Sequence, residues 1–195
     1  MSKVPPPYIG WLTATKGAAT GCRFAVLQGI QNVGSGPNNH VVITDPGVSK
    51  CHFGIKVDQS GRILADYGSR TGTFENAQKI HQGELDEGDT FAMGEGAELT
   101  YSSHAPSPVP SPWKLVYGKM FGFMARSHAL SLGDNWFGDA EAADFELGEA
   151  PWVGALRVYP DRVVLLHGQG FLQTRALTKG DRFELGGKAV TLQGG

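Results

Sequence analysis

The sequence has little of what marks several common protein classes. Its 195 residues include only two cysteines, Cys22 and Cys51, and carry a formal net charge of −2. Two thiols fit free buried side chains in a reducing compartment at least as well as one disulfide. So small a net charge gives no electrostatic reason to expect nucleic acid as the main partner. No apolar run approaches a membrane span, and the opening MSKVPPPYIGW has no apolar signal core, so we expect a soluble, cytoplasmic protein.

Helical periodicity is scarce as well. No run of apolar residues keeps the i, i+3, i+4, i+7 spacing, and the best candidate, DAEAADFELG, is short and bounded by glycine. Short apolar alternations such as RFAVL, HVVIT, RILAD and LRVYP recur instead, among 28 scattered glycines and 11 prolines. The predicted fold class is all-β.

A proline-rich segment marks a boundary near the middle of the chain. In HAPSPVPSP, His104–Pro112, four prolines alternate with small residues, so we expect an extended backbone without partners in a sheet ladder. The length is sufficient for two small domains, each with its own core. We therefore predict one domain over residues 1–104, a linker over 105–112 and a second domain over 113–195.

Two sequence matches across this boundary predict two copies of one β-sandwich. GDTFAMGEGA, Gly88–Ala97, agrees with GDRFELGGKA, Gly180–Ala189, at the Gly-Asp pair and at Phe, Gly and Ala. Further upstream, Gly34 and Gly138 each precede by seven residues a pair of apolar residues separated by one position. Gly-Asp turns are common between strands, which would explain the first match but not both in the same order.

The stretch DPGVSKCHFGIKV, Asp45–Val57, combines a strand pattern with a polar entrance. Alternate residues from Cys51 to Val57 are apolar, which is the period of a half-buried strand. Ser49 and Lys50 place a hydroxyl and an ammonium directly before it. Taken alone, these two residues are better explained as a solvated turn, but they are also the groups that would hold an anion.

Five segments of the first half, in chain order, resemble a forkhead-associated (FHA) domain: VGSGPNNHVVI, VSKCHFGIKV, ILADYGSRTGTFEN, KI and LDEGDTFAMG. The resemblance covers roughly Tyr8 to Tyr101. It implies a β-sandwich whose loops at one end recognise phosphothreonine peptides. Phosphothreonine carries nearly two negative charges and three acceptor oxygens, so such a site needs short donors and fixed cations.

The resemblance assigns roles to residues in three loops. Ser49 falls on the phosphate-binding serine, and His52 falls on the histidine that braces the loop from behind. The phosphopeptide-binding residues expected from the resemblance are Ser49, Lys50, Arg70, Thr71, Ser35 and Asn38. The residues expected to support the loops are Gly34, His52, Ser69, Gly72 and Asn76.

Three departures from the family pattern weaken this expectation. Ser35 stands where the family has an arginine, and Lys50 replaces a second arginine without its planar fork. Thr71 replaces the asparagine that holds the peptide backbone. Each lost charge-assisted hydrogen bond costs about 1.5–3 kcal/mol. Arg70 would restore positive charge if it points into the loops.

The second half shows the sandwich pattern without the site. Laying Gly138 on Gly34 without gaps places Ser49–His52 on Val153–Leu156. No Ser-Arg-x-His remains, and we match the GTF turn with QGF at Gln169–Phe171. Apolar residues cannot hold a phosphate dianion, so we expect a divergent FHA-like sandwich with a structural or docking role. Its large aromatic residues are expected in the core or, alternatively, on a partner surface: Trp136, Phe137 and Trp152.

No residue set supports catalysis, a metal or a cofactor. VGSGPNN lacks the GK[ST] of a P-loop and the order of a hydrolase elbow. Cys51 and His52 are adjacent and would point to opposite faces of a strand, and the other histidines lack ligand spacing. Asp86, Glu87 and Asp89 are expected to be solvated.

The sequence therefore predicts a non-enzymatic interaction or adaptor protein. In the leading hypothesis the first half binds a protein partner phosphorylated on threonine, and the resemblance implies an upstream Ser/Thr kinase. Ser49 would donate to the phosphate, Lys50 and Arg70 would supply charge, and Thr71 would touch the peptide backbone. The alternative is a phosphate-independent scaffold in which both sandwiches dock partners through their faces and the phosphate site is vestigial.

Overall fold

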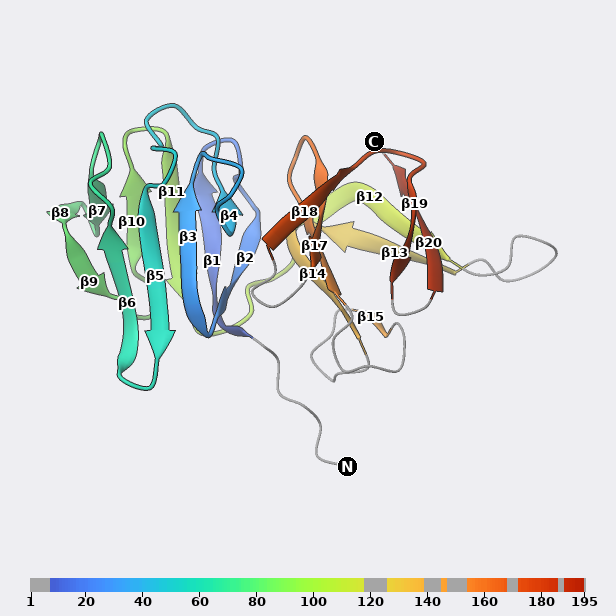
Figure 1. Cartoon of the computed structure of the whole chain (residues 1–195), viewed down its shortest axis with the longest axis horizontal. Coiled ribbons are helices and arrows are strands. Elements are labelled where there is room, and N and C mark those ends of the chain that lie inside the picture. Colours follow the sequence, from blue (N-terminus) through green and yellow to red (C-terminus); the bar gives the residue numbers. More distant parts are fainter. Residues whose placement is uncertain are drawn as a thin grey trace. The chain divides into compact units, whose positions relative to one another are not determined.

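The computed structural model of the protein describes the following residues (Figure 1): 8–117, 126–138, 145–146, 154–167, 172–185 and 188–194. These ranges contain strands and turns and no helix, which confirms the all-β class. The chain divides between Ser107 and Pro108 into two compact units. The first unit is Pro7–Ser107 and the second contains Pro108–Gly195, so the division falls inside the predicted linker.

The first unit is a sandwich of two layers. Its strands are β1 (Tyr8–Lys16), β2 (Arg23–Leu27), β3 (Gly29–Gly34), β4 (Val41–Val42), β5 (Phe53–Asp58), β6 (Gly61–Asp66), β7 (Thr73–Glu75), β8 (Gln78–Ile80), β9 (Gln82–Glu84), β10 (Thr90–Met93) and β11 (Ala97–Ser102). One layer has the order β2-β1-β11-β10-β7-β8 and the other β4-β3-β5-β6-β9, and in Figure 1 the second stands in front of the first. Period-two alternation produces the core between them: Phe24, Phe53, Phe91 and Leu99 are fully buried.

The strand that follows Ser49 begins two residues later than the alternation predicts. β5 starts at Phe53, Cys51 is exposed, and His52 is fully buried, so the expected pattern is wrong at its start. The expectation of a buried thiol holds for Cys22 and fails for Cys51, although both cysteines are free. The physical reason is that the His52 ring turns inward to make hydrogen bonds, which leaves its neighbour on the outside.

The second unit is also built of two layers of strands. Its strands are β12 (Pro110–Tyr117), β13 (Arg126–Ser131), β14 (Gly133–Gly138), β15 (Phe145–Glu146), β16 (Gly154–Val158), β17 (Val163–His167), β18 (Leu172–Leu177), β19 (Arg182–Leu185) and β20 (Lys188–Gly194). The pairing orders are β13-β12-β20-β19 and β15-β14-β16-β17-β18. A cluster of apolar side chains that includes Leu115, Leu156 and Leu192 forms its core. Trp136 and Phe137 are buried, as expected, whereas Trp152 lies outside the described residues.

β12 takes in residues that the sequence assigned to the linker. Pro110 pairs with Ser131, and the Leu132 N–H donates to the Val109 carbonyl at 2.8 Å. The expectation that this segment has no ladder partners is therefore wrong from Val109 onward. Proline lacks the N–H donor, but carbonyl groups of a proline-rich strand still accept hydrogen bonds, and a register shift between Pro110 and Lys114 accommodates the missing donors.

The second unit repeats the strand pairing of the first. β12, β13, β20 and β19 pair as β1, β2, β11 and β10 do, and β14 to β18 pair as β3, β4, β5, β6 and β9 do. Gly34 and Gly138, matched from the sequence, each end a strand that pairs in parallel with a two-residue strand. The repeat predicted from the sequence is therefore present in the strand order.

A side-chain amide recurs at the same corner of both units. Gln31 Oε1 accepts from the Leu27 N–H at 2.7 Å, and Asn135 Oδ1 accepts from the Ser131 N–H at 2.8 Å. In each unit the amide follows by two residues a glycine with positive φ, Gly29 or Gly133. The amide satisfies backbone groups where one strand ends and the next begins in the other layer.

Candidate functional site

Three loops at one end of the first unit, residues 35–40, 43–52 and 67–72, are tied together by hydrogen bonds, and we call them the loop cluster. The Ser35 and Gly36 N–H groups donate to the carbonyls of Ser49 and Lys50 at 2.9 and 3.0 Å. The buried Asn39 side chain adds a second bond to the Lys50 carbonyl at 2.6 Å. The first loop thus fixes the backbone of the Ser49-Lys50 pair.

Gly34 is required for this close approach. A Cβ built on Gly34 would lie 2.5 Å from the Lys50 carbonyl oxygen, and one on Gly36 would lie 2.9 Å from it. Both distances are below ordinary van der Waals contact, and the obstacle is backbone. The supporting role predicted for Gly34 thus has a steric basis in this structure.

Ser49 is held from behind and leaves its hydroxyl proton available. Its Oγ accepts the Arg70 backbone N–H at 2.9 Å, and its own N–H donates to His52 Nδ1 at 3.0 Å. Among the described residues the Ser49 hydroxyl has no acceptor. A serine fixed by an incoming N–H and carrying a free O–H is suited to donate to an oxyanion.

His52 connects the second loop to the third. Because Nδ1 accepts the Ser49 N–H, Nε2 carries the proton and donates to the Gly72 carbonyl at 3.2 Å. Burial lowers the pKa of His52, although the Gly72 carbonyl and the Asp66 carboxylate act in the opposite direction. The ring is therefore neutral at physiological pH, and its one N–H proton is bonded to the Gly72 carbonyl.

Lys50 and Arg70 are exposed at the rim of the loop cluster. Within the described part of the chain, neither side chain has an ion pair, and the backbone N–H of Lys50 has no acceptor. The structure brings the backbone of Arg70, and not its guanidinium, to Ser49. Both cations are thus available to a ligand at the loop end.

The hydroxyls of Ser35 and Thr71 are directed into the protein. Ser35 Oγ donates to the Val48 carbonyl at 3.0 Å, and Thr71 Oγ1 donates to the Gly47 carbonyl at 2.9 Å. Each keeps lone pairs that can accept, but its proton is used within the loop cluster. Asn38, the other expected contact, is exposed on the first loop.

Asp66 organises the third loop and was not identified from the sequence. Its carboxylate accepts from the Gly68 N–H, from the Ser69 N–H and hydroxyl, and from the Thr73 hydroxyl, at 2.6–2.9 Å. Burial raises the pKa of Asp66, but the hydrogen bonds from Ser69, Thr73 and Gly68 outweigh it and bring the pKa to about 2. The signal that would have found it is an Asp two residues before a Gly-Ser pair, which is typical of an Asx-turn.

Asn76 lies outside the loop cluster. It occupies the two-residue turn between β7 and β8, where its amide donates to Asp89 Oδ1 at 2.8 Å and accepts the Thr90 N–H at 3.0 Å. It thus supports the β7–β8 turn against β10, while Ser69 and Gly72 do contact Asp66 and His52.

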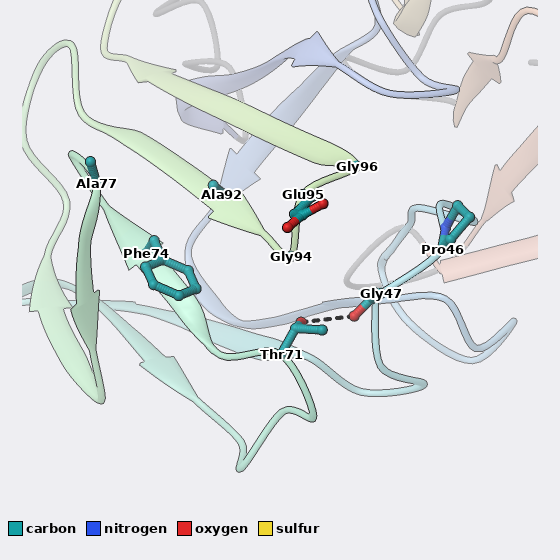
Figure 2. Close-up of a pocket in the computed structure, with 9 residues that line it drawn as sticks. All are labelled: Pro46, Gly47, Thr71, Phe74, Ala77, Ala92, Gly94, Glu95 and Gly96. Atoms are coloured by element: carbon teal, nitrogen blue, oxygen red, sulfur yellow. Dashed lines mark hydrogen bonds between the residues drawn. The ribbon is translucent and has the colours of Figure 1, made fainter.

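A hollow of about 850 Å³ adjoins the loop cluster, and Figure 2 shows the residues that line it. Its walls are mostly apolar, and Glu95 is the one charged side chain among the lining residues. Thr71 and Gly47 belong both to the hollow and to the loop cluster, and their hydrogen bond appears as the dashed line in Figure 2. The lining residues are Pro46, Gly47, Thr71, Phe74, Ala77, Ala92, Gly94, Glu95 and Gly96.

The described residues contain no group of three or more His, Cys, Asp or Glu side chains arranged to hold a metal ion. The same part of the chain has no helix long and apolar enough to span a membrane.

Strand register corrects the comparison of the loop cluster with the second unit. Val33 pairs with Phe53, whereas its counterpart Phe137 pairs with Gly154. Phe53 therefore corresponds to Gly154, and the ungapped superposition is wrong by three residues because the second unit has the shorter connection. On this register Ser49–His52 falls on residues 150–153, which lie outside the described residues and read Ala-Pro-Trp-Val in the sequence.

The sandwich and its loop cluster place the first unit among FHA domains, since the model of the FHA domain matches residues 32–94. This match includes all three loops of the loop cluster, and the first unit contains an FHA domain. It does not extend to the second unit, for which only the strand pairing shared with the first unit is shown.

Relatives of known name match the same part of the chain. The glycogen accumulation regulator GarA of Mycobacterium tuberculosis is 28% identical over 89 residues, which are 46% of this chain and 55% of that protein. The chain thus spans about half the length of the curated relatives it matches. The FHA domain of the CT664 protein from Chlamydia trachomatis is 26% identical with a TM-score of 0.46, and covers 49% of this chain and 98% of that one. The FhaA FHA domain, complexed with the intracellular domain of Rv3910, is 27% identical with a TM-score of 0.42, and covers 46% of this chain and 98% of that one.

Proposed function

We propose that the protein is a non-catalytic adaptor whose FHA domain binds a partner segment carrying phosphothreonine. The observation that carries this proposal is the state of Ser49. Its oxygen is held by the Arg70 N–H while its proton has no acceptor among the described residues. A buried histidine and a buried asparagine fix the backbone around it. The match to the FHA domain model over residues 32–94 supports the same interpretation.

The donors of the loop cluster suit a phosphate dianion. Ser49 Oγ and the Lys50 N–H would donate to two of its oxygens, and the Lys50 ammonium would supply charge at short range. The backbone N–H of Arg70 already contacts Ser49. The exposed Arg70 side chain therefore starts near the anion and is long enough to reach it. Charge-assisted bonds of this kind contribute about 1.5–3 kcal/mol each.

The hydrogen bond of Thr71 limits how it would touch a peptide backbone. Its proton is bound to the Gly47 carbonyl, so toward a peptide backbone it can only accept a hydrogen bond. The chain beyond the phosphothreonine would instead lie over the apolar hollow of Figure 2, with a side chain seated against Phe74 and Ala92. Apolar burial would thus replace part of the polar grip that an asparagine provides.

A second candidate function is a phosphate-independent scaffold. Ser35, in the place of the family's arginine, directs its hydroxyl to the Val48 carbonyl and offers a ligand neither a proton nor a charge. A partner would then dock through the apolar hollow alone, and phosphorylation would not change its affinity.

The two functions are separated by titrating the protein with a degenerate phosphothreonine peptide library and with its unphosphorylated twin. We expect saturable binding of the phosphorylated library only, and a loss of about tenfold or more in Ser49→Ala, because the hydroxyl bond to the phosphate disappears. Ser60→Ala is the matched control, since its hydroxyl contacts only Asp58 in the β5–β6 turn. Equal affinity for both libraries would favour the scaffold, as would a Ser49→Ala protein that binds normally.

A further inference from the structure

Ser35 brings no charge to the loop cluster, whose exposed cations described above are Lys50 and Arg70, and a further cation, Lys79, lies close to it. Lys79 belongs to β8, which is hydrogen-bonded to β7 and pairs Lys79 with Phe74. Residues directly opposite each other in an antiparallel pair present their side chains on the same face. Lys79 therefore stands on the face where Phe74 lines the apolar hollow.

The Lys79 side chain crosses Gly72 at the base of the loop cluster. Its Cε lies 2.7 Å, and its Nζ 3.2 Å, from the point where a Gly72 Cβ would be. Glycine suits position 72 for two reasons. Its φ of +83° favours glycine, and the absence of a side chain leaves room for the aliphatic part of Lys79. A side chain at residue 72 would have to displace Lys79.

The backbone beneath Lys79 is the same one that fixes Ser49. The Gly72 carbonyl accepts from His52 Nε2, and His52 Nδ1 accepts the Ser49 N–H. Two hydrogen bonds through one buried ring thus connect the residue under the ammonium to the residue that would donate to phosphate. Lys79 is an exposed residue, and among the described residues no carboxylate pairs with its ammonium.

We propose that Lys79 is a third cation of the partner-binding surface, which pairs with negative charge on the phosphothreonine segment. This inference rests on the proposed function. Lys50, Arg70 and Lys79 then surround the loop end with three unpaired charges in place of an arginine at Ser35. The negative group is either the phosphate or the carboxylate of an acidic side chain beside the phosphothreonine. Both present negatively charged oxygens to an ammonium.

The test measures peptide affinity by calorimetry for Lys79→Gln, for Lys79→Arg and for the parent protein. Three synthetic peptides serve as probes: phosphothreonine between neutral residues, phosphothreonine between aspartates, and the second peptide without phosphate. We expect Lys79→Gln to weaken phosphopeptide binding by about three- to tenfold, with Lys79→Arg close to the parent. The parent's salt dependence should also be steeper than that of Lys79→Gln. Lys56→Gln is the matched control, because Lys56 is exposed in the same unit but pairs with Asp58 at 2.6 Å.

The outcomes separate the two proposals. Weakening of both phosphopeptides alike assigns Lys79 to the phosphate, and weakening confined to the aspartate-flanked peptide assigns it to the acidic side chain. If Lys79→Gln matches Lys56→Gln on every peptide while Ser49→Ala loses binding, the role of Lys79 is wrong and the proposed function stands. If the parent binds the aspartate-flanked peptide equally with and without phosphate, phosphothreonine recognition itself fails, and the role of Lys79 in it fails too. Lys79 is exposed, and an unchanged melting temperature would show that the variants are folded.

Discussion

Apart from the β7–β8 hairpin, the described strands of the two units pair in the same order, but their polar side chains lie in different places. In the first unit, Ile30 and Lys56 pair across β3 and β5, and Ile30 is 60% exposed. At the corresponding pair in the second unit, Asp134 and Arg157 are 0% and 2% exposed. They form a bidentate ion pair, in which Arg157 Nε donates to Oδ1 at 2.5 Å and a second guanidinium nitrogen donates to Oδ2 at 2.8 Å.

The difference shows that the shared strand pairing does not depend on polar side chains either in the loops or at the paired sheet positions. The first unit concentrates them in the loop cluster, where Asn39, His52 and Asp66 hold backbone groups at the surface. The second has a buried ion pair, Asp134–Arg157, within the sheet, and the sequence at the positions corresponding to Ser49–His52 is apolar. The polar loop cluster is therefore an addition to the sandwich, which agrees with function residing in sites rather than in folds.

The largest effect is expected where the second unit departs most from the first. Asp134→Asn removes the charge that compensates the buried Arg157, so it should destabilise the second unit by about 3–5 kcal/mol. Urea unfolding followed by tryptophan fluorescence would measure it, because three of the four tryptophans (Trp113, Trp136 and Trp152) belong to that unit.

The matched control is the corresponding exposed position in the first unit. Ile30→Ala should change stability little, because the side chain is mostly in water already. If Asp134→Asn were as mild as Ile30→Ala, the ion pair would contribute no more than surface contacts do, and the contrast between the units would disappear.

A feature of the fold or of the loop cluster could be predicted from the sequence where the pattern that indicates it is local. The all-β class follows from alternation and the repeat from spacing, whereas the supporting roles of Gly34 and His52 stay predictions of the family motif. Asn39 and Asp66 were missed because their importance comes from backbone groups that only the folded loops bring to them. The closeness of Lys79 to Gly72 was missed for a similar reason, since the two lie seven positions apart and only the β7–β8 hairpin brings them together.

The beginning of β5 and the register of the second unit also could not be read from spacing. An alternation pattern assumes that the chain is already extended, whereas the chain at Cys51 and His52 is still in a loop. The three-residue error arose because a superposition without gaps assumes loops of equal length, and loop length is the part of a repeat that varies most.

The next effect in size tests whether the loop cluster of the first unit depends on Asp66. Asp66→Asn keeps the shape but removes the charge that accepts bonds from Ser69, Thr73 and Gly68, and should cost about 1–3 kcal/mol at neutral pH. Because the pKa of Asp66 is about 2 in the folded protein and about 4 when unfolded, its contribution is present above pH 4 and is lost as the pH falls toward 2. Urea unfolding at pH 7 and pH 3 would measure both.

Asp58→Asn is the control for that experiment. The Lys56 ammonium and the Ser60 hydroxyl also lower the pKa of Asp58, but this carboxylate lies in an exposed turn, where such contacts contribute little. The difference between the two variants at pH 7 should therefore shrink at pH 3. A difference that stayed constant with pH would mean that the Asp66 charge does not stabilise the loop cluster.

The smallest effect concerns the β7–β8 hairpin, which has no counterpart among the described strands of the second unit and which carries Lys79. Its turn residues, Asn76 and Ala77, have φ values of 47° and 69°, a pair typical of a type I′ turn in which glycine is favoured at the second position. Ala77→Gly should therefore stabilise the first unit by up to about 1 kcal/mol. Ala65→Gly, in the extended strand β6, should instead destabilise it, since glycine there only adds freedom to the unfolded chain. Thermal unfolding of both variants checks the sign, and a stabilising Ala65→Gly or a destabilising Ala77→Gly would contradict the turn assignment.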